Sequence, residues 1–404
     1  MTRKLWNKDF ILLLQGSAVS TIGDLMYSIA IGYWVYTETG SNSLMGVMSS
    51  ISMFVTMFLS PFTGSIIDKC NRKWVLVGMD LMQSALMLTV GVFAYLDKLT
   101  VLGVLAAAFL AAFGSVFYSP ASSTLMLDII PRDDMVRGQS IFSGSNSLIN
   151  MVSSALSGAM VAFLGVPLIV VINGLSNLYS TISEMFIRVP KTVGQGDAVT
   201  LKTVARDTRA AIRAIWSEPC LRIFVPSALI LNLLTAGPLS LLLPFCMEKE
   251  FTVEMYGYLM AVWTLASLLC VILLGAVKLK PRARFWTMAI GFCTSELFMI
   301  AAYISNNIIL TCVLAFIAAL LNTAGNTVFN ASLMLALPEE NRGAILGFIQ
   351  SASVGGVALS AVIYGCLGDV FPLYAVFIVG SALSLFPMAF MCFHKRTKEF
   401  VISH

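Results

Sequence analysis

The stretch LTVLGVLAAAFLAAFGSVFYSPASSTLML (residues 99–127) contains no charged residue. Lys98 precedes it and Asp128 follows it, so charge marks both of its ends. An α-helix rises 1.5 Å per residue, and about 20 apolar residues therefore cross the roughly 30 Å hydrocarbon core of a bilayer. The stretch predicts a transmembrane helix.

The rest of the chain has the same character. Of 404 residues, 58% are hydrophobic and 11% are charged, and the mean hydropathy is +0.87. Charged residues make up about 25% of an ordinary soluble protein. This composition excludes a disordered chain and disfavours a soluble enzyme built on one core. We predict a polytopic membrane protein.

Apolar runs bounded by charge, proline or glycine predict twelve membrane spans. They lie near residues 10–36, 42–67, 74–95, 99–127, 139–164, 166–187, 221–246, 254–277, 285–304, 308–336, 344–367 and 371–393. The start, MTRKLWNKDF, resembles the basic region of a signal peptide, but the long run behind it has no small-residue cleavage site. We expect it to remain as the first span of an all-α membrane protein.

Basic residues predict the orientation, because lysine and arginine near span ends stay on the cytoplasmic side. With the N-terminus inside, 23 of the 25 lysine and arginine residues fall in cytoplasmic segments, and only Lys98 and Lys249 fall outside. One missing or extra span would invert every later loop and remove this asymmetry. The pattern predicts a multi-pass protein of the cytoplasmic membrane with both termini in the cytoplasm.

A long polar interval separates two sets of six spans. We predict an N-terminal six-helix bundle in residues 1–190, a cytoplasmic linker in 191–219 and a C-terminal six-helix bundle in 220–404. The halves resemble each other, since Arg137-Gly138 recurs as Arg342-Gly343 and Leu164-Gly165 as Leu367-Gly368. A duplicated six-helix unit places a cavity near the bilayer midplane.

The linker is patterned as an amphipathic helix. Its apolar stripe is Leu201, Val204, Ala211 and Ile215, and its basic stripe is Lys202, Arg206, Arg209 and Arg213. We expect it to lie along the anionic cytoplasmic leaflet. A simple connection between the halves and a calmodulin-like target are the alternatives.

Residues typical of enzyme and metal sites are scarce. The two histidines, His394 and His404, lie in the polar C-terminal tail, and most of the eight cysteines lie inside apolar runs. The net charge of +4 is spread over several loops, and no Gly-x-x-x-x-Gly-Lys-Ser/Thr phosphate loop occurs. We predict no enzyme activity, no catalytic residues, no cofactor, no metal and no nucleic-acid partner.

The loop between the second and third spans reads Gly64-Ser65-Ile66-Ile67-Asp68-Lys69-Cys70-Asn71-Arg72-Lys73. It resembles the signature loop of the major facilitator superfamily, Gly-x-x-x-Asp-Arg/Lys-x-Gly-Arg-Arg/Lys. Asn71 replaces the usual glycine, and we expect it to take the left-handed turn that asparagine tolerates best after glycine. The resemblance implies two pseudo-symmetric six-helix halves and transport by alternating access.

The same loop supplies most of the predicted gating residues, which are Gly64, Asp68, Arg72, Lys73 and, at the end of span four, Asp128. Gly64 allows another helix to approach closely, and Asp68 can cap a facing helix or pair with Arg72 while the cytoplasmic side is closed. The resemblance places Asp128 in the same charge relay. Alternatively, these charges only anchor the loop in the cytoplasm.

Span four and the residues after it indicate a branch of this family. Residues 113–121, FGSVFYSPA, followed by Asp128-Ile129-Ile130-Pro131, resemble the twelve-span macrolide-efflux-type group of drug:proton antiporters. Span five departs from the antiporter motif, because it lacks the proline that usually precedes a Gly-Gly pair. The resemblance implies export of drug-like compounds in exchange for protons.

Two acidic residues lie deep in predicted spans, Asp24 in span one and Glu296 in span nine. A carboxylate at the centre of a membrane helix costs roughly 2.5–3.5 kcal/mol, so it usually faces water or a partner. We predict that Asp24 carries the coupling proton, with Glu296 as the second candidate and a structural hydrogen bond as the alternative for each. Asp80 and Glu184 lie near cytoplasmic ends, and we interpret them as anchors.

Asparagine and aromatic residues recur on several spans. An amide left unpaired in lipid is costly, so these faces must meet water, substrate or another helix. The predicted substrate-binding residues are Tyr27, Tyr118, Asn146, Asn150, Asn232, Trp263, Asn322 and Asn326. They suit a large amphipathic ligand, and hydrogen bonding between helices is the alternative for half of them.

Together, these features predict a secondary active transporter that works as a monomer in the lipid bilayer. We expect it to export amphipathic drug-like or lipid-like molecules by alternating access, with the proton gradient as the energy source. Sodium coupling, substrate uptake and lysophospholipid movement are alternatives within transport. A membrane sensor that transports nothing is the alternative from a different class.

Overall fold

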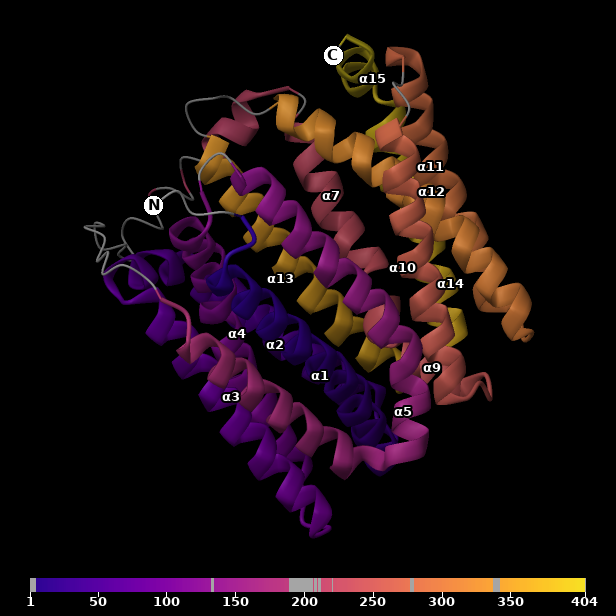
Figure 1. Ribbon diagram of the computed structural model, residues 1–404. Helices are drawn as coiled ribbons and strands as arrows, with labels where there is room; N and C mark the ends of the chain where they lie inside the picture. The colour runs from indigo at the N-terminus through magenta and orange to yellow at the C-terminus, as the bar shows by residue number, and fades with distance from the viewer. Residues whose placement is uncertain are drawn as a thin grey trace. The chain divides into compact units, whose positions relative to one another are not determined.

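The computed structural model describes residues 5–131, 134–188, 206, 209, 212–219, 221–276, 280–336 and 342–403. Every regular element in these ranges is a helix (Figure 1). The chain forms two compact units. The first unit is Met1–Gly40 with Ile51–Thr200, and the second unit is Ser41–Ser50 with Leu201–His404. The predicted all-α membrane fold is confirmed.

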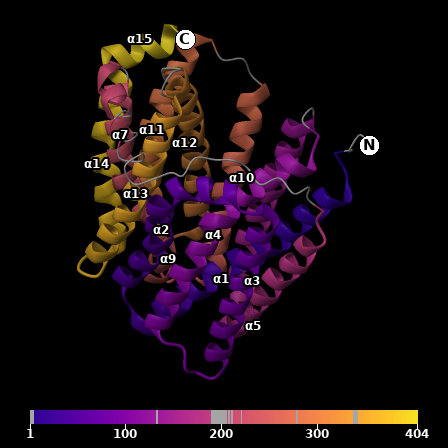
Figure 2. The ribbon, with the colours of Figure 1, turned by 90° about the vertical axis from the view of Figure 1, so that its left-hand side faces the viewer.

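The first helices of the chain are α1 (Lys8–Thr39), α2 (Asn42–Lys69), α3 (Arg72–Tyr95), α4 (Val101–Ile129) and α5 (Met135–Met185). Asn7 begins α1 by accepting the backbone N–H of Phe10 at 2.9 Å, and Gly40 ends it in the left-handed conformation. Helix α5 packs against α1 and α3, and Figures 1 and 2 show the three helices side by side.

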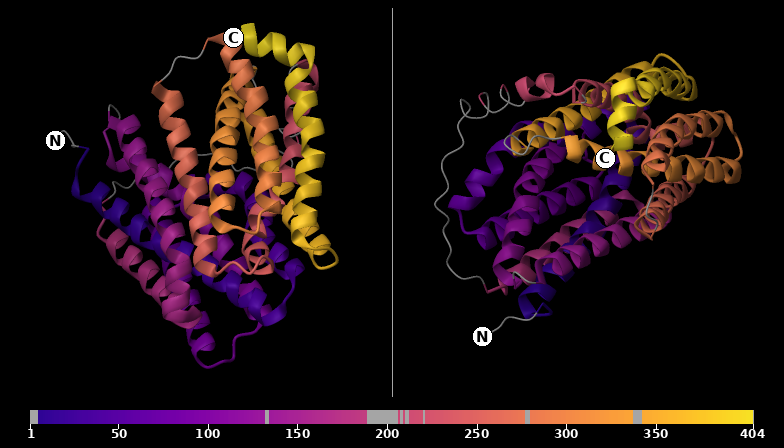
Figure 3. Two further views of the ribbon diagram at one scale, coloured as in Figure 1. Left: turned by 90° about the vertical axis from the view of Figure 1, so that its right-hand side faces the viewer. Right: turned by 90° about the horizontal axis from the view of Figure 1, so that it is seen from above.

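The later helices lie in the second unit. They are α7 (Leu221–Thr235), α8 (Gly237–Ser240), α9 (Leu242–Glu248), α10 (Val253–Ala276), α11 (Pro281–Ile304), α12 (Ile308–Ala336), α13 (Arg342–Gly368), α14 (Leu373–Phe393) and α15 (Lys395–Ser403). Helix α12 packs against α10 and α11, and α14 packs against α7 and α11. The left panel of Figure 3 shows the helices from α10 to α14, orange to yellow, running alongside one another.

Eleven helices in the described ranges are long and apolar enough to cross a membrane. The remaining predicted span, 139–164, is the first part of α5, which continues through Gly165 into the sixth predicted span. Gly165 has φ 72° and ψ 162°, which only glycine adopts readily, and Pro167 follows it. The two spans are thus joined through a single non-helical residue.

The seventh predicted span, 221–246, is interrupted, because the chain there forms α7, α8 and α9 in succession. The break falls before Gly237 and Pro238, where a proline has no N–H to donate. Ser360 of α13 bridges it, because its hydroxyl donates to the Leu233 carbonyl at 2.7 Å and accepts the Gly237 N–H at 2.8 Å. Such replacement bonds make a broken helix tolerable at membrane depth.

The predicted amphipathic helix of the linker lies mostly outside the described residues. Within it, the structure describes Arg206, Arg209 and the helical turns of residues 212–217. The position of this segment along the membrane surface stays a prediction.

Candidate substrate and proton sites

The gating residues come together at the start of α3. Nη1 of Arg72 lies 2.8 Å from Oδ2 of Asp128 on α4, and both side chains are less than a fifth exposed. Lys73 donates to the Met185 carbonyl at the end of α5 at 2.6 Å. Gly64 and Asp68 belong to α2, but the surroundings of Gly64 and the side chain of Asp68 lie outside what the structure describes. The structure therefore joins Arg72 to Asp128, and the predicted pairing of Asp68 with Arg72 stays a prediction because the Asp68 side chain lies outside the described residues.

Asn71 does not take the expected left-handed turn. Its φ of −74° and ψ of 108° are those of extended backbone, and it occupies the N-cap position of α3. The residue at an N-cap usually has extended backbone, and any residue type can adopt that conformation. The replacement of the family glycine by Asn71 therefore needs no strained conformation.

Asp24 lies on the α1 face that approaches α5, and its side chain is exposed. Nδ2 of Asn177 is 3.4 Å from Oδ1 of Asp24 and also donates to Oδ1 of Asn173 at 2.9 Å. The preceding Gly23 permits this approach, because a Cβ there would lie 2.7 Å from Oδ1 of Asn173. A carboxylate held this way is accessible and has a neutral hydrogen-bond donor beside it.

The anchor interpretation of Asp80 and Glu184 is wrong. Asp80 is 2% exposed and Glu184 is fully buried, so neither side chain is exposed on the protein surface, as an anchoring charge would be. Tyr118 of α4, predicted to bind substrate, instead donates its hydroxyl to Oε1 of Glu184 at 2.9 Å. The sequence carried a signal that we did not use: the polar residues Asn173, Asn177, Ser180 and Glu184 recur on one face of the sixth span.

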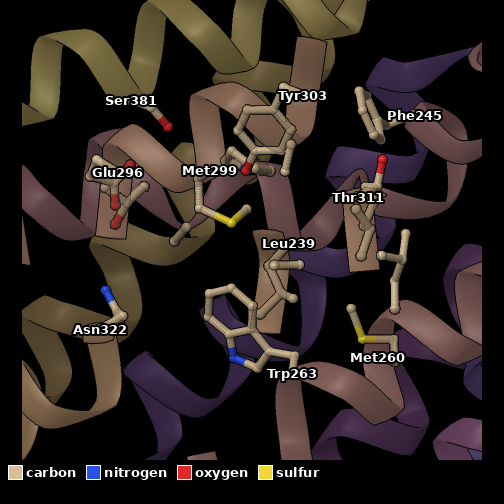
Figure 4. Close-up of a pocket in the computed structure, with 17 residues that line it drawn as sticks. Leu239, Phe245, Met260, Trp263, Glu296, Met299, Tyr303, Thr311, Asn322 and Ser381 are labelled. Atoms are coloured by element: carbon tan, nitrogen blue, oxygen red, sulfur yellow. The ribbon is translucent and has the colours of Figure 1, made fainter. Parts of the chain in front are cut away.

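A cavity of about 170 Å³ lies inside the second unit. Its walls are mainly apolar, with Phe245, Met260 and Trp263 among them, and Glu296 contributes one carboxylate. Figure 4 shows Glu296, Ser381 and Asn322 together on one side of the cavity. Glu296 is 6% exposed, and Ser381 of α14 is its hydrogen-bond partner. The arrangement suits a ligand with a large apolar part and one polar group.

A second cavity of about 370 Å³ adjoins the first, since Thr235 and Asn322 line both. Its polar residues are Asn232, Thr235, Asn322, Asn326, Asn330, Gln350 and Ser353. Nδ2 of Asn326 donates to Oδ1 of Asn322 at 2.8 Å, so the two amides are held in a fixed relation. Thr235, which both cavities share, is the last residue of α7.

The predicted substrate residues thus divide between the units. Asn232, Trp263, Asn322 and Asn326 line the two cavities of the second unit. Tyr27, Tyr118, Asn146 and Asn150 belong to the first unit and line neither of them. Tyr27 is half-buried, and its hydroxyl has no hydrogen-bond partner among the described residues. Within the described ranges, no group of three or more His, Cys, Asp or Glu residues could hold a metal ion.

The second unit also has a carboxylate outside the membrane spans, Asp369, which binds the start of α2. Asp369 follows α13 and accepts the Asn42 N–H at 2.6 Å and the Ser43 N–H at 3.2 Å at the start of α2. The loss of some hydrating water acts to raise the pKa of Asp369, but the hydrogen bonds donated by Ser43, Asn42 and Ser41 outweigh it and hold the pKa below its ordinary value. Asp369 therefore stays ionised at the positive end of a helix.

Comparison with known proteins gives a consistent family and fold. The family model described as Major Facilitator Superfamily matches residues 13–237 and 227–400. Macrolide efflux protein A of Streptococcus pyogenes is 23% identical over 186 residues, and this match covers only about half of each chain (46% of both). The multidrug efflux pump Tap of Mycolicibacterium fortuitum is 22% identical over 394 residues, covering 93% of this chain and 92% of Tap.

Solved structures show the same fold at low sequence identity. A bacterial homolog of the human lysosomal transporter Spinster superposes with a TM-score of 0.72 at 14% identity, covering 100% of this chain and 97% of that chain. The nucleoside transporter NupG superposes with a TM-score of 0.74 at 13% identity, covering 96% and 99%.

Proposed function

Because the chain belongs to the major facilitator superfamily, we propose that it exports amphipathic small molecules across the cell membrane in exchange for protons. Its family and fold make it a multi-pass membrane transporter and not an enzyme. We further propose that both termini lie in the cytoplasm and that the protein works as a monomer.

The apolar cavity of the second unit is the observation that carries the substrate class. Aromatic and methionine side chains offer polarisable, adaptable surface to ligands of varied shape. Glu296 and Asn322 add a carboxylate and an amide at one side. Pockets of this kind bind through apolar area and are oriented by a few polar groups. The resemblance to efflux proteins supports export of such ligands.

The proton is assigned to Asp24 because this carboxylate is exposed on a membrane helix and hydrogen-bonded by Asn177. A coupling group must exchange protons with water in at least one conformation, and an exposed carboxylate can do so. Glu296 is less accessible and lines the ligand cavity, which makes it the second candidate.

The first step of the test selects a ligand. The detergent-solubilised protein is screened by thermal shift against antibiotics, lysolipids, siderophores and sugars, because a ligand that binds the folded state raises its apparent stability. We expect amphipathic antibiotics or lysolipids to give the largest shifts. Shifts confined to sugars would contradict the amphipathic assignment.

The second step measures flux of the best ligand in proteoliposomes with an acidic interior and a clamped membrane potential. Protein-free liposomes serve as the control, because a weakly basic ligand can accumulate in an acidic interior without any transporter. Antiport predicts accumulation that stops when an ionophore collapses the pH gradient. Accumulation only with an acidic exterior would indicate proton-coupled uptake, a requirement for sodium would indicate sodium coupling, and binding without any flux would indicate a sensor.

A further inference from the structure

The first unit contains two carboxylates that no transport step described above uses. Asp80 on α3 is 2% exposed and Glu184 on α5 is fully buried. Helix α3 packs against the part of α5 that follows Gly165 (Figures 1 and 2). The two acids interact electrostatically, and Ser180 of α5 lies beside both of them. They therefore form one buried pair.

The surroundings of this pair contain acids and hydroxyls. Asp24 faces it from α1 and Tyr118 from α4, and both interact electrostatically with Asp80. The two basic residues at the start of α3 are engaged elsewhere, Arg72 with Asp128 and Lys73 with the Met185 carbonyl. Within the part of the chain that the structure describes, neither acid of the pair has an ion-pair partner.

Hydrogen bonding satisfies the pair only in part. Oε1 of Glu184 accepts the Tyr118 hydroxyl at 2.9 Å and lies 3.5 Å from Oγ of Ser180. Oε2 of Glu184 and Oδ2 of Asp80 are buried and have no hydrogen-bond partner among the described residues. A buried polar atom without a hydrogen-bond partner is costly, so its presence indicates a bound ligand or a proton whose position the non-hydrogen atoms do not show.

A proton accounts for these observations. Burying one uncompensated carboxylate costs several kcal/mol, and a second like charge beside it raises that cost. Two carboxyl groups sharing one site therefore do not both ionise. One proton removes a charge and converts an orphan oxygen into a hydrogen-bond donor, while the other carboxylate keeps its acceptor role.

We propose that Asp80 and Glu184 form a second proton-binding site that holds one proton between them at neutral pH. The site lies between α3 and α5, and the Asn177 that bonds Asp24 is two helical turns from Glu184 on the same helix. The proposal does not depend on the direction of transport or on the substrate, because it concerns the resting charge of the first unit.

Infrared spectroscopy of the purified full-length protein tests the proposal. The intensity of the protonated-carboxyl C=O band at neutral pH is compared between wild type and Asp80→Asn/Glu184→Gln, whose amides resemble protonated acids in size. We expect the double variant to lose the intensity of one protonated carboxyl and of one carboxylate. Glu38→Gln, at an exposed position on α1, serves as control and should lose carboxylate intensity alone.

Two results would overturn the shared proton. No loss of protonated-carboxyl intensity would mean that both acids are ionised, and loss of two would mean that both are neutral. If the double variant does not fold, the wild type is titrated to alkaline pH and compared with Glu184→Gln. The proposal expects a protonated-carboxyl band that titrates in wild type and is shifted or absent in Glu184→Gln, and an identical titration in both proteins contradicts it.

Discussion

The two units place similar polar residues in different surroundings. In the first unit, asparagines four residues apart on α5 are buried against α1 and α3, with Asn173 and Asn177 at most 1% exposed. In the second unit, Asn322 and Asn326 on α12 have the same spacing but line an open cavity. The difference lies in the facing helix. Gly16 and Gly23 let α1 approach the polar face of α5 closely.

The largest expected effect comes from separating α1 and α5. A side chain at Gly23 would collide with Asn173 and Ser176, so Gly23→Leu should cost about 3 kcal/mol or more of folding free energy. The measurement is the folded fraction and thermal stability in detergent. Gly78→Leu is the control, because no atom lies within 4 Å of a Cβ built there. Equal stability of the two variants would contradict the close packing.

A smaller effect is expected in the cavity of the second unit. Trp263→Ala should weaken binding of the selected ligand about tenfold, equivalent to about 1.4 kcal/mol, because an aromatic wall of the cavity is lost. Affinity is measured by titration of the purified protein. Trp286→Ala removes a half-exposed tryptophan from α11 outside both cavities and should leave affinity unchanged. Equal losses of ligand affinity in the two variants would contradict ligand binding in this cavity.

The ion pair between Arg72 and Asp128, at the ends of α3 and α4, tests whether these residues act in gating. The partly exposed Arg72–Asp128 pair is worth about 1 kcal/mol, so Asp128→Asn should change the transport rate about fivefold while ligand affinity stays the same. The exchanged pair Arg72→Asp/Asp128→Arg should recover part of the rate. A fall in affinity proportional to the fall in rate would place these residues in binding instead of gating.

The smallest effect is expected at Asp369, whose carboxylate accepts hydrogen bonds from the start of α2 in the second unit. Its pKa is lower in the folded protein, so its contribution to stability is present above the ordinary aspartate pKa of about 4 and is lost as pH falls through the lowered value. Because Asp369 is exposed, we expect Asp369→Asn to cost less than about 1 kcal/mol.

Thermal unfolding at neutral and acidic pH measures this contribution. The difference between wild type and Asp369→Asn should shrink as pH falls. Asp97→Asn is the matched control, since Asp97 has φ 52°, which asparagine also tolerates. A difference that stays constant with pH would show that the Asp369 charge is not what stabilises the start of α2.

The sequence predicted the fold well, because hydropathy and charge report directly on the membrane. Apolar length located the spans, and the family loop pointed to the major facilitator fold. The break at Gly237 was missed because three short helices and one long helix have the same hydropathy. Only the Gly-Pro pair signalled it.

The site was harder to predict, because depth in a span does not say which way a residue faces. Glu296 and the asparagines of α12 line cavities, whereas Tyr118 turns toward Glu184. Asp80 and Glu184 were interpreted from their distance to a charged loop, and their burial depends on neighbouring helices that a single sequence does not place. The polar repeat on the sixth span was the available clue.

The most direct test of the account separates proton coupling from ligand binding in the same liposomes. Flux of the selected ligand is measured with and without an imposed pH gradient for Asp24→Asn and Glu296→Gln. Asp24→Asn should lose gradient-driven accumulation and keep downhill exchange, because the amide preserves size but cannot titrate. Glu296→Gln should keep gradient dependence but show weaker ligand binding. Accumulation that survives in Asp24→Asn and disappears in Glu296→Gln would contradict the assignment of the coupling proton to the first unit.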